Sequence, residues 1–210
     1  MQRFRDFLKR KDIEISLRRY GIDALSAMAQ GLFCSLLIGT ILNTLGQQFH
    51  IGFLNAIIFT LGKGDAAVGY TIGGCASLMV GPAMAVAIGY ALHAPQLVLF
   101  SLIAVGGAAN ELGGAGGPLA VYLIAIIAAE VGKLVSKETK IDILVTPAVT
   151  ILVGVALAKW IAPPIGTAAS AFGIIIDNAT KLQPFWMGIA VSVLVGIALT
   201  LPISLSLIHI

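Results

Sequence analysis

Residues 96–135 read QLVLFSLIAVGGAANELGGAGGPLAVYLIAIIAAEVGKLV, in which two apolar runs flank a glycine-rich segment. A membrane-crossing helix needs ~20 mostly apolar residues to cover ~30 Å of hydrocarbon. We therefore predict transmembrane spans at about 96–110 and 117–135. Glycine inside a helix costs ~1 kcal/mol relative to alanine. The glycines of 105–118 thus predict that a turn, partly sunk in the membrane, joins the two spans.

The rest of the chain has the same apolar character. Hydrophobic residues make up 58% of its 210 residues and charged residues only 11%, whereas soluble domains average about 25% charged. So few charges cannot cover a globular surface in water. Further spans are predicted at about 23–46, 66–92, 143–162 and 185–204. The sequence indicates an all-α, polytopic transmembrane helical bundle, and it argues against a soluble enzyme, a disulfide scaffold and a nucleic-acid-binding protein.

Two segments do not fit simple spans. Residues 47–64 are apolar but short and interrupted, and residues 163–184 begin with two prolines and end in a polar cluster. We predict that both are re-entrant or interfacial helical segments. Non-helical backbone at membrane depth is tolerated only inside protein or beside a wet cavity, so such breaks point to a transport site.

Basic residues are concentrated in two places. Of the 13 lysines and arginines, seven lie within residues 1–20 and three within 130–142. Basic residues favour the cytoplasmic side of a membrane, so the N-terminus and the 130–142 loop are both predicted to be cytoplasmic. Residues 1–20 are either an amphipathic helix on an anionic inner leaflet or a basic tail that only sets the topology.

Asn110 and Glu111, within the glycine-rich segment, are the first candidate solute-binding residues. An ionisable residue at membrane depth costs at least ~2.5 kcal/mol and usually faces a cavity. A carboxylate accepts hydrogen bonds from sugar hydroxyls, and a carboxamide both donates and accepts them. The alternative is an exposed turn in which Glu111 is simply solvated.

A second polar cluster precedes Pro184-Phe185-Trp186. Its members are Asp177, Asn178, Thr180, Lys181 and Gln183. Polar groups beside aromatic rings would suit a sugar platform, but they would equally suit an interfacial anchor.

Other polar residues have simpler interpretations. Asp23 is predicted to cap the first span, and the isolated His50 and His93 predict no metal site. No nucleophile with a base partner is visible, so no catalytic residue and no cofactor are expected.

Five segments resemble one known family. They are 15–42, 91–101 (ALHAPQLVLFS), 109–120 (ANELGGAGGPLA), 130–154 and 179–204. The chain is similar to the membrane enzyme IIC family of the bacterial phosphoenolpyruvate-dependent sugar phosphotransferase system, in its second branch. The resemblance implies a permease of the bacterial inner membrane, in a homodimer, that binds and translocates a sugar. It also implies IIB and IIA partner chains, which carry the phosphorylated cysteine and histidine.

The domain expected from this resemblance spans residues 21–204 and is shorter than related domains. Residues 205–210, LSLIHI, can be encoded by a string that resembles the end of a transposon-based sequencing adapter. We expect these six residues to be an artefact and the domain to be incomplete; the alternative is a natural apolar tail. Two other functions also stay open, a secondary transporter that does not phosphorylate its solute and a membrane sensor or scaffold of the same fold.

Overall fold

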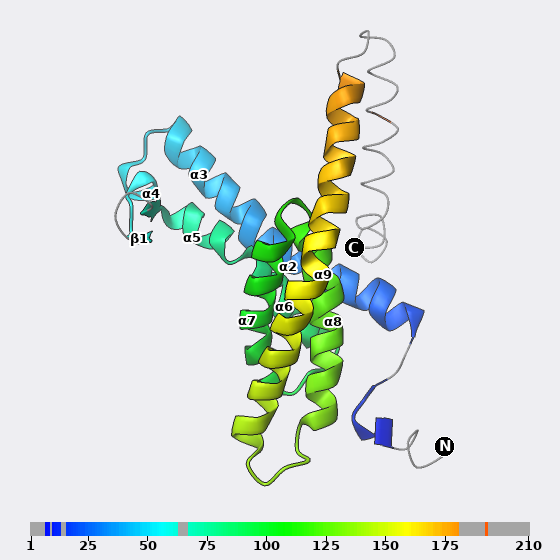
Figure 1. Ribbon diagram of the computed structural model, residues 1–210. Coiled ribbons are helices and arrows are strands. Elements are labelled where there is room, and N and C mark those ends of the chain that lie inside the picture. The colour runs from blue at the N-terminus through cyan, green and yellow to red at the C-terminus, as the bar shows by residue number, and fades with distance from the viewer. Residues whose placement is uncertain (1–6, 9, 14–15, 63–66, 181–191, 193–210) are drawn as a thin grey trace.

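The computed structural model describes residues 7–8, 10–13, 16–62, 67–180 and 192 (Figure 1). Within these ranges the regular secondary structure is helical apart from one small β-hairpin, which confirms the all-α class. Helices α2 (Ala24–Leu32), α6 (Val80–Ala91), α7 (Gln96–Gly113), α8 (Gly117–Val135) and α9 (Asp142–Thr180) pack against one another as a bundle. Its core consists largely of small side chains such as Ala85, Ala109, Ala125 and Ala128.

Small residues also allow the helix backbones to approach closely. A Cβ atom added at Gly81 would lie 2.4 Å from the Gly106 carbonyl oxygen, and one at Gly106 equally close to that of Gly81. Helices α6 and α7 therefore touch through their backbones. Such contacts suit a membrane interior, where lipid tails give no hydrophobic drive for helices to associate.

The first predicted span is confirmed as a continuous helix over Arg18–Gln48. It comprises η1 (Arg18–Asp23), α2, η2 (Phe33–Leu37) and α3 (Ile38–Gln48), of which η1 and η2 are π-helical. The predicted N-cap at Asp23 is wrong, because its side chain makes no capping hydrogen bond. The chain is already helical from Arg18, so Asp23 has no helix end to cap.

The second predicted span is broken. Helices α5 (Ile72–Leu78) and α6 meet at Met79 with a bend of 53°. Pro82, in the first turn of α6, has no N–H to donate to Leu78, and its ring would clash with that carbonyl if the helix were continuous. Helix α5 instead packs on α3, and the two project from the bundle as an arm (Figure 1).

The segment 47–64 is not the surface or re-entrant helix that we predicted. It contains one helical turn, α4 (Gly52–Asn55), and the strand β1 (Phe59–Leu61), which pairs antiparallel with β2 (Val68–Tyr70). Phe59 lies opposite Tyr70, and their rings stack with centroids 5.5 Å apart. Aromatic and β-branched residues favour strands, and here they outweigh the apolar character that suggested a helix.

The two spans of the opening segment are confirmed as α7 and α8, which pack against each other. The turn lies later than predicted, because α7 continues through Asn110 and Glu111 to Gly113. A short 3₁₀ stretch, η4 (Gly114–Gly116), then reverses the chain. Gly114 has a φ of +49°, a conformation that glycine adopts without steric cost.

Helix α9 is longer than predicted. It continues through Pro163 and Pro164 to Thr180, so the break expected at 163 is wrong. Backbone contacts of Ile165 with Gly116 and of Gly166 with Gly113 hold the turn after the prolines against α7 and η4. Its 39 residues correspond to ~58 Å at 1.5 Å per residue, more than a bilayer core needs.

Three helices in the described ranges are long and apolar enough to cross a membrane. They are Arg18–Gln48, Gln96–Val135 and Asp142–Ala171, and the bent α5–α6 pair would make four. The second of these, Gln96–Val135, is not one straight helix. It comprises α7 and α8, and the chain folds back between them at Gly114. The span predicted at 185–204 and residues 205–210 lie outside the part that the structure describes.

Candidate functional site

Glu111 lines a hollow between the end of α7 and the second half of α9, which we call the Glu111 groove. Its volume is about 480 Å³, within the roughly 300–1,000 Å³ typical of small-molecule sites. The residues that matter for its chemistry are Glu111, Gly113, Gly114, Pro163, Thr167 and Ser170.

Backbone contacts set the two sides of this groove close together. A Cβ atom added at Gly166 on α9 would lie 2.5 Å from the Gly113 carbonyl oxygen on α7. One added at Gly116 would lie 2.8 Å from the Ile165 carbonyl oxygen. Because no side chain separates the helices here, polar groups on α7 and α9 line the same small space.

The groove offers one carboxylate and two hydroxyl groups. The Glu111 side chain is exposed on the last turn of α7. Thr167 Oγ1 donates to the Pro164 carbonyl at 2.9 Å, and Ser170 Oγ donates to the Gly166 carbonyl at 2.9 Å. Both hydroxyl protons are used within α9, so these oxygens are left as acceptors. Such a set suits a ligand that is rich in O–H donors.

Asn110 is not among the residues that line the Glu111 groove. It lies instead against two glycines, because a Cβ added at Gly81 would meet Asn110 Cβ at 2.6 Å and one at Gly117 would meet Asn110 Oδ1 at 2.6 Å. The two adjacent candidates thus lie on different sides of α7, as neighbouring residues in a helix do.

The second predicted cluster is only partly described. Asp177 and Asn178 lie on α9 beyond Ser170, so Asp177 is about two turns, or ~10 Å, farther along the helix. Lys181 and Gln183 fall outside the described residues. A sugar-binding role for these four residues stays a prediction.

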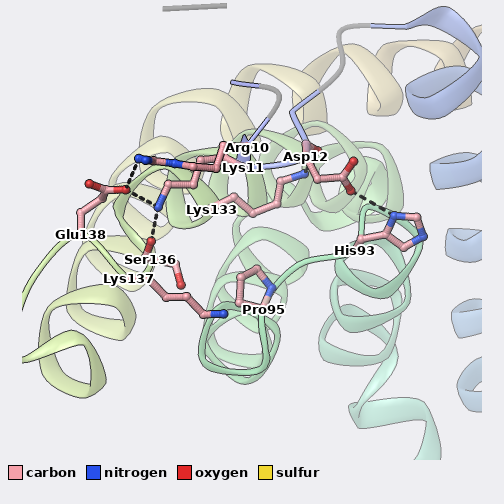
Figure 2. Close-up of a pocket in the computed structure, with 9 residues that line it drawn as sticks. All are labelled: Arg10, Lys11, Asp12, His93, Pro95, Lys133, Ser136, Lys137 and Glu138. Atoms are coloured by element: carbon pink, nitrogen blue, oxygen red, sulfur yellow. Dashed lines mark hydrogen bonds and ion pairs between the residues drawn. The ribbon is translucent and has the colours of Figure 1, made fainter. Parts of the chain in front are cut away.

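Sequence reasoning missed a dense polar cluster at the opposite end of α7, where the N-terminal segment meets the ends of α6 and α8 (Figure 2). We call it the Lys133 cluster. It surrounds a hollow of about 460 Å³ that is lined by Arg10, Lys11, Asp12, His93, Pro95, Lys133, Ser136, Lys137 and Glu138. Glu111 follows Gln96 by fifteen residues on α7, or ~22 Å of helix, which separates the cluster from the groove.

Lys133 is the buried centre of this cluster, with its side chain 1% exposed. Its Nζ donates to the Asp12 carbonyl at 2.9 Å, to the Leu92 carbonyl at 3.0 Å and to Glu130 Oε1 at 3.2 Å. A buried ammonium is tolerated when it is paired and hydrogen-bonded. The sequence held one signal, the spacing of Glu130 and Lys133 by three residues on one helix face.

Two acids of the cluster are held in the charged state. The Arg19 guanidinium, 2.6 Å from Asp12 Oδ2, is the main cause that lowers the pKa of Asp12 to about 2 from its usual 3.8. Hydrogen bonding to Lys11 lowers the pKa of Glu138 in the same direction. Both carboxylates are therefore fully charged at neutral pH.

Among the residues that the structure describes, no group of three or more His, Cys, Asp or Glu side chains could hold a metal ion. A family model described as "Phosphotransferase system, EIIC" matches residues 22–208. No curated protein and no solved structure matches the chain.

Proposed function

Because the chain belongs to the phosphotransferase system EIIC family, we propose that it binds a polyhydroxylated solute, a sugar or sugar alcohol, in the Glu111 groove. It is a membrane component of that system, and its apolar helices fit several membrane spans. The solute would then cross the membrane and meet a IIB partner, which phosphorylates it and is recharged by IIA. The homodimer stays a prediction.

The observation that carries this proposal is the groove's set of polar groups. A carboxylate from α7 and two acceptor hydroxyls from α9 line one hollow of about 480 Å³. A site built to hydrogen-bond hydroxyls loses affinity when one acceptor is removed, because the ligand's buried donors are left unpaired at ~1–3 kcal/mol each. Glu111 is the strongest acceptor in the set, since hydrogen bonds to a charged group are the stronger kind.

The test is equilibrium binding of D-glucose and D-mannitol, as a hexose and a hexitol, to the full chain in lipid nanodiscs. We expect binding of at least one, weakened about tenfold or more by Glu111→Gln, in line with ~1.4 kcal/mol for a tenfold change. Glu111→Ala should weaken binding at least as much, and Asn110→Ala less.

Asp23→Asn is the matched control, because it removes one exposed carboxylate away from the groove. Binding by Glu111→Ala at the parental level would show that this carboxylate is only a solvated helix-end residue. A solute that binds and crosses the membrane but is not phosphorylated when charged IIB and IIA are present would instead favour a transporter that does not phosphorylate its solute.

A further inference from the structure

We propose that the described residues between 7 and 23 belong to a strap that closes the end of the bundle opposite the Glu111 groove and acts as an inner gate for the solute. The described part of this strap, 7–8, 10–13 and 16–23, lies across the C-terminal ends of α6 and α8 (Figure 2). That the strap covers this end follows from its contacts. That it gates a solute rests on the proposed function.

Asp12 is the centre of the strap. Its carboxylate accepts from Arg19 at 2.6 and 3.2 Å, and it lies 3.1 Å from His93 Nδ1, just beyond the end of α6. Its backbone carbonyl accepts from the buried Lys133 of α8. Asp12 thus makes contacts within the strap, through Arg19, and contacts with the ends of α6 and α8.

Leu92, just after α6, is the point that the strap covers. Its carbonyl accepts from Arg19 at 2.8 Å and from Lys133 at 3.0 Å, and its side chain is fully buried. The last carbonyls of a helix lack intrahelical partners and form the negative end of its dipole. Arg19 of the strap places a positive charge at this negative end of α6.

A second set of contacts continues along α8. Tyr20 OH donates to Glu130 Oε1 at 3.1 Å, and Tyr122 OH donates to the Tyr20 carbonyl at 2.7 Å. Glu130 in turn pairs with Lys133. The strap is therefore attached to α8 over three turns, from Tyr122 to Lys133.

The loop after α8 is attached to the strap as well. Lys11 Nζ lies 2.6 Å from Glu138 Oε1 and also donates to the Ser136 carbonyl, while Arg10 lies 3.2 Å from Glu138. The first and last of these pairs are partly exposed, so each is worth little alone. Together they close the remaining side of the hollow.

Three residues around the hollow of the Lys133 cluster have positive φ values: Asp12 (54°), His93 (54°) and Lys137 (62°). At His93 this conformation ends α6, because the Ala94 N–H bonds to the Gly89 carbonyl in the way that many helices end. At Lys137 it belongs to the turn after α8, which the Glu138 N–H closes on the Val135 carbonyl. Only Asp12 lies on the strap, and aspartate is among the residues that adopt a positive φ most readily.

The experiment measures how well the strap shields Leu92. In full-length protein with Cys34→Ala and Cys75→Ala, a cysteine probe is introduced by Leu92→Cys and treated with a water-soluble maleimide in nanodiscs, where both faces are accessible. We expect slow labelling, accelerated about tenfold by Arg19→Gln and by Asp12→Asn, equivalent to ~1.4 kcal/mol less closure. Asn suits the positive φ at position 12, so that variant removes the charge without adding backbone strain.

Arg18→Gln is the matched control, because it removes the same charge from an exposed neighbouring side chain. Its labelling rate should equal that of the parent. A second probe, Ala120→Cys, replaces a fully buried residue at the groove end and should stay protected in every variant. The proposal that the strap shields Leu92 would be overturned by equal labelling rates of Leu92→Cys in all variants. It would also be overturned if Ala120→Cys labelling accelerated to the same extent.

A separate arm tests gating. Arg19→Gln should change the rate of D-mannitol or D-glucose counterflow in proteoliposomes, whereas Arg18→Gln should not. Counterflow in the parent with no change in Arg19→Gln would reject the gate but not the strap. If no counterflow occurs even in the parent, the proposed function fails while the labelling result still stands.

Discussion

At the scale of single residues, most of the charged side chains that the structure describes lie at one end of the bundle, in and around the Lys133 cluster. Lys133 is buried with three acceptors around it, and removing one member of such a buried pair typically costs ~3–5 kcal/mol. Glu111, at the other end, is exposed and lines an open groove. The first arrangement suits a structural closure, and the second suits a group that awaits a ligand.

The ion pairs of Asp12 should make the strap sensitive to acid. Its pKa is about 2 in the folded chain and ordinarily 3.8, so the native state favours the charged form. The resulting stabilisation is complete above the ordinary pKa and is lost as the pH falls from about 4 through about 2. Hydrogen exchange over residues 7–23, corrected for its intrinsic pH dependence, should be slow at pH 5 and rise across that window.

Asp12→Asn provides the control for this acid response. Its exchange at pH 5 should already be fast, with a smaller further rise on acidification that belongs to Glu138, whose pKa is lowered as well. An identical acid response in parent and variant would assign the effect to other groups.

At the scale of elements, proline has opposite outcomes in two helices of the bundle. Pro82 breaks the second span at Met79, whereas α9 continues through Pro163 and Pro164. The difference lies in packing, because α9 is held against α7 and η4 just after its prolines by Ile165 and Gly166. Helix α5 packs on α3 in the arm, whereas α6 packs on the bundle, so the chain changes direction at Met79, just before Pro82.

The crossing of α7 and α9 should not tolerate a larger residue. In Gly166→Ala the new Cβ would lie 2.5 Å from the Gly113 carbonyl oxygen, so the helices must move apart. We expect a loss of ~1–3 kcal/mol in the free energy of unfolding, as in other overpacked cores. Thermal unfolding in one detergent, followed by circular dichroism, measures it.

Gly21→Ala is the control for this substitution. A Cβ at Gly21 meets nothing within 4 Å, and alanine is favoured over glycine in a helix by ~1 kcal/mol. This variant should therefore be as stable as the parent or slightly more so. A Gly166→Ala protein that melts with the parent would show that the crossing is loose.

At the scale of the whole molecule, the structure places the N-terminal segment and the loop after α8 at one end of the bundle. Lys11 and Glu138 join them directly, and Lys133 binds the Asp12 carbonyl. Figure 1 shows α7 and α9 running away from that end and α8 returning to it. The described part of the N-terminal basic segment therefore lies at the same end of the bundle as the loop after α8. That this end faces the cytoplasm stays a prediction.

Which side that is can be measured by labelling. In a chain with Cys34→Ala and Cys75→Ala, Lys137→Cys should react with an impermeant maleimide only after cells are permeabilised, because basic segments stay in the cytoplasm. Ala115→Cys, exposed at the groove end, should react in intact cells. Labelling of position 137 in intact cells would reverse the orientation and place the strap outside.

Local composition alone was enough to predict several features. The apolar runs predict helices, because an uncharged run of that length has few other stable forms in lipid. The glycines of 105–118 predict a turn, which the structure places at Gly114–Gly116, and the basic clusters predict which segments are cytoplasmic. Each of these features depends on residues that are near one another in the chain. The candidate Glu111 was found in the same way, from a charge in an apolar region.

The tertiary structure alone decided the rest. Thr167 and Ser170 join Glu111 only because α9 crosses α7 at Gly166, more than fifty positions along the chain. Asp12 meets Lys133 and His93 only because the bundle brings the ends of α6 and α8 together. Whether a proline breaks a helix depended on what packs beside it. Local composition carries no information about such partners, so the strap could be seen only in the folded chain.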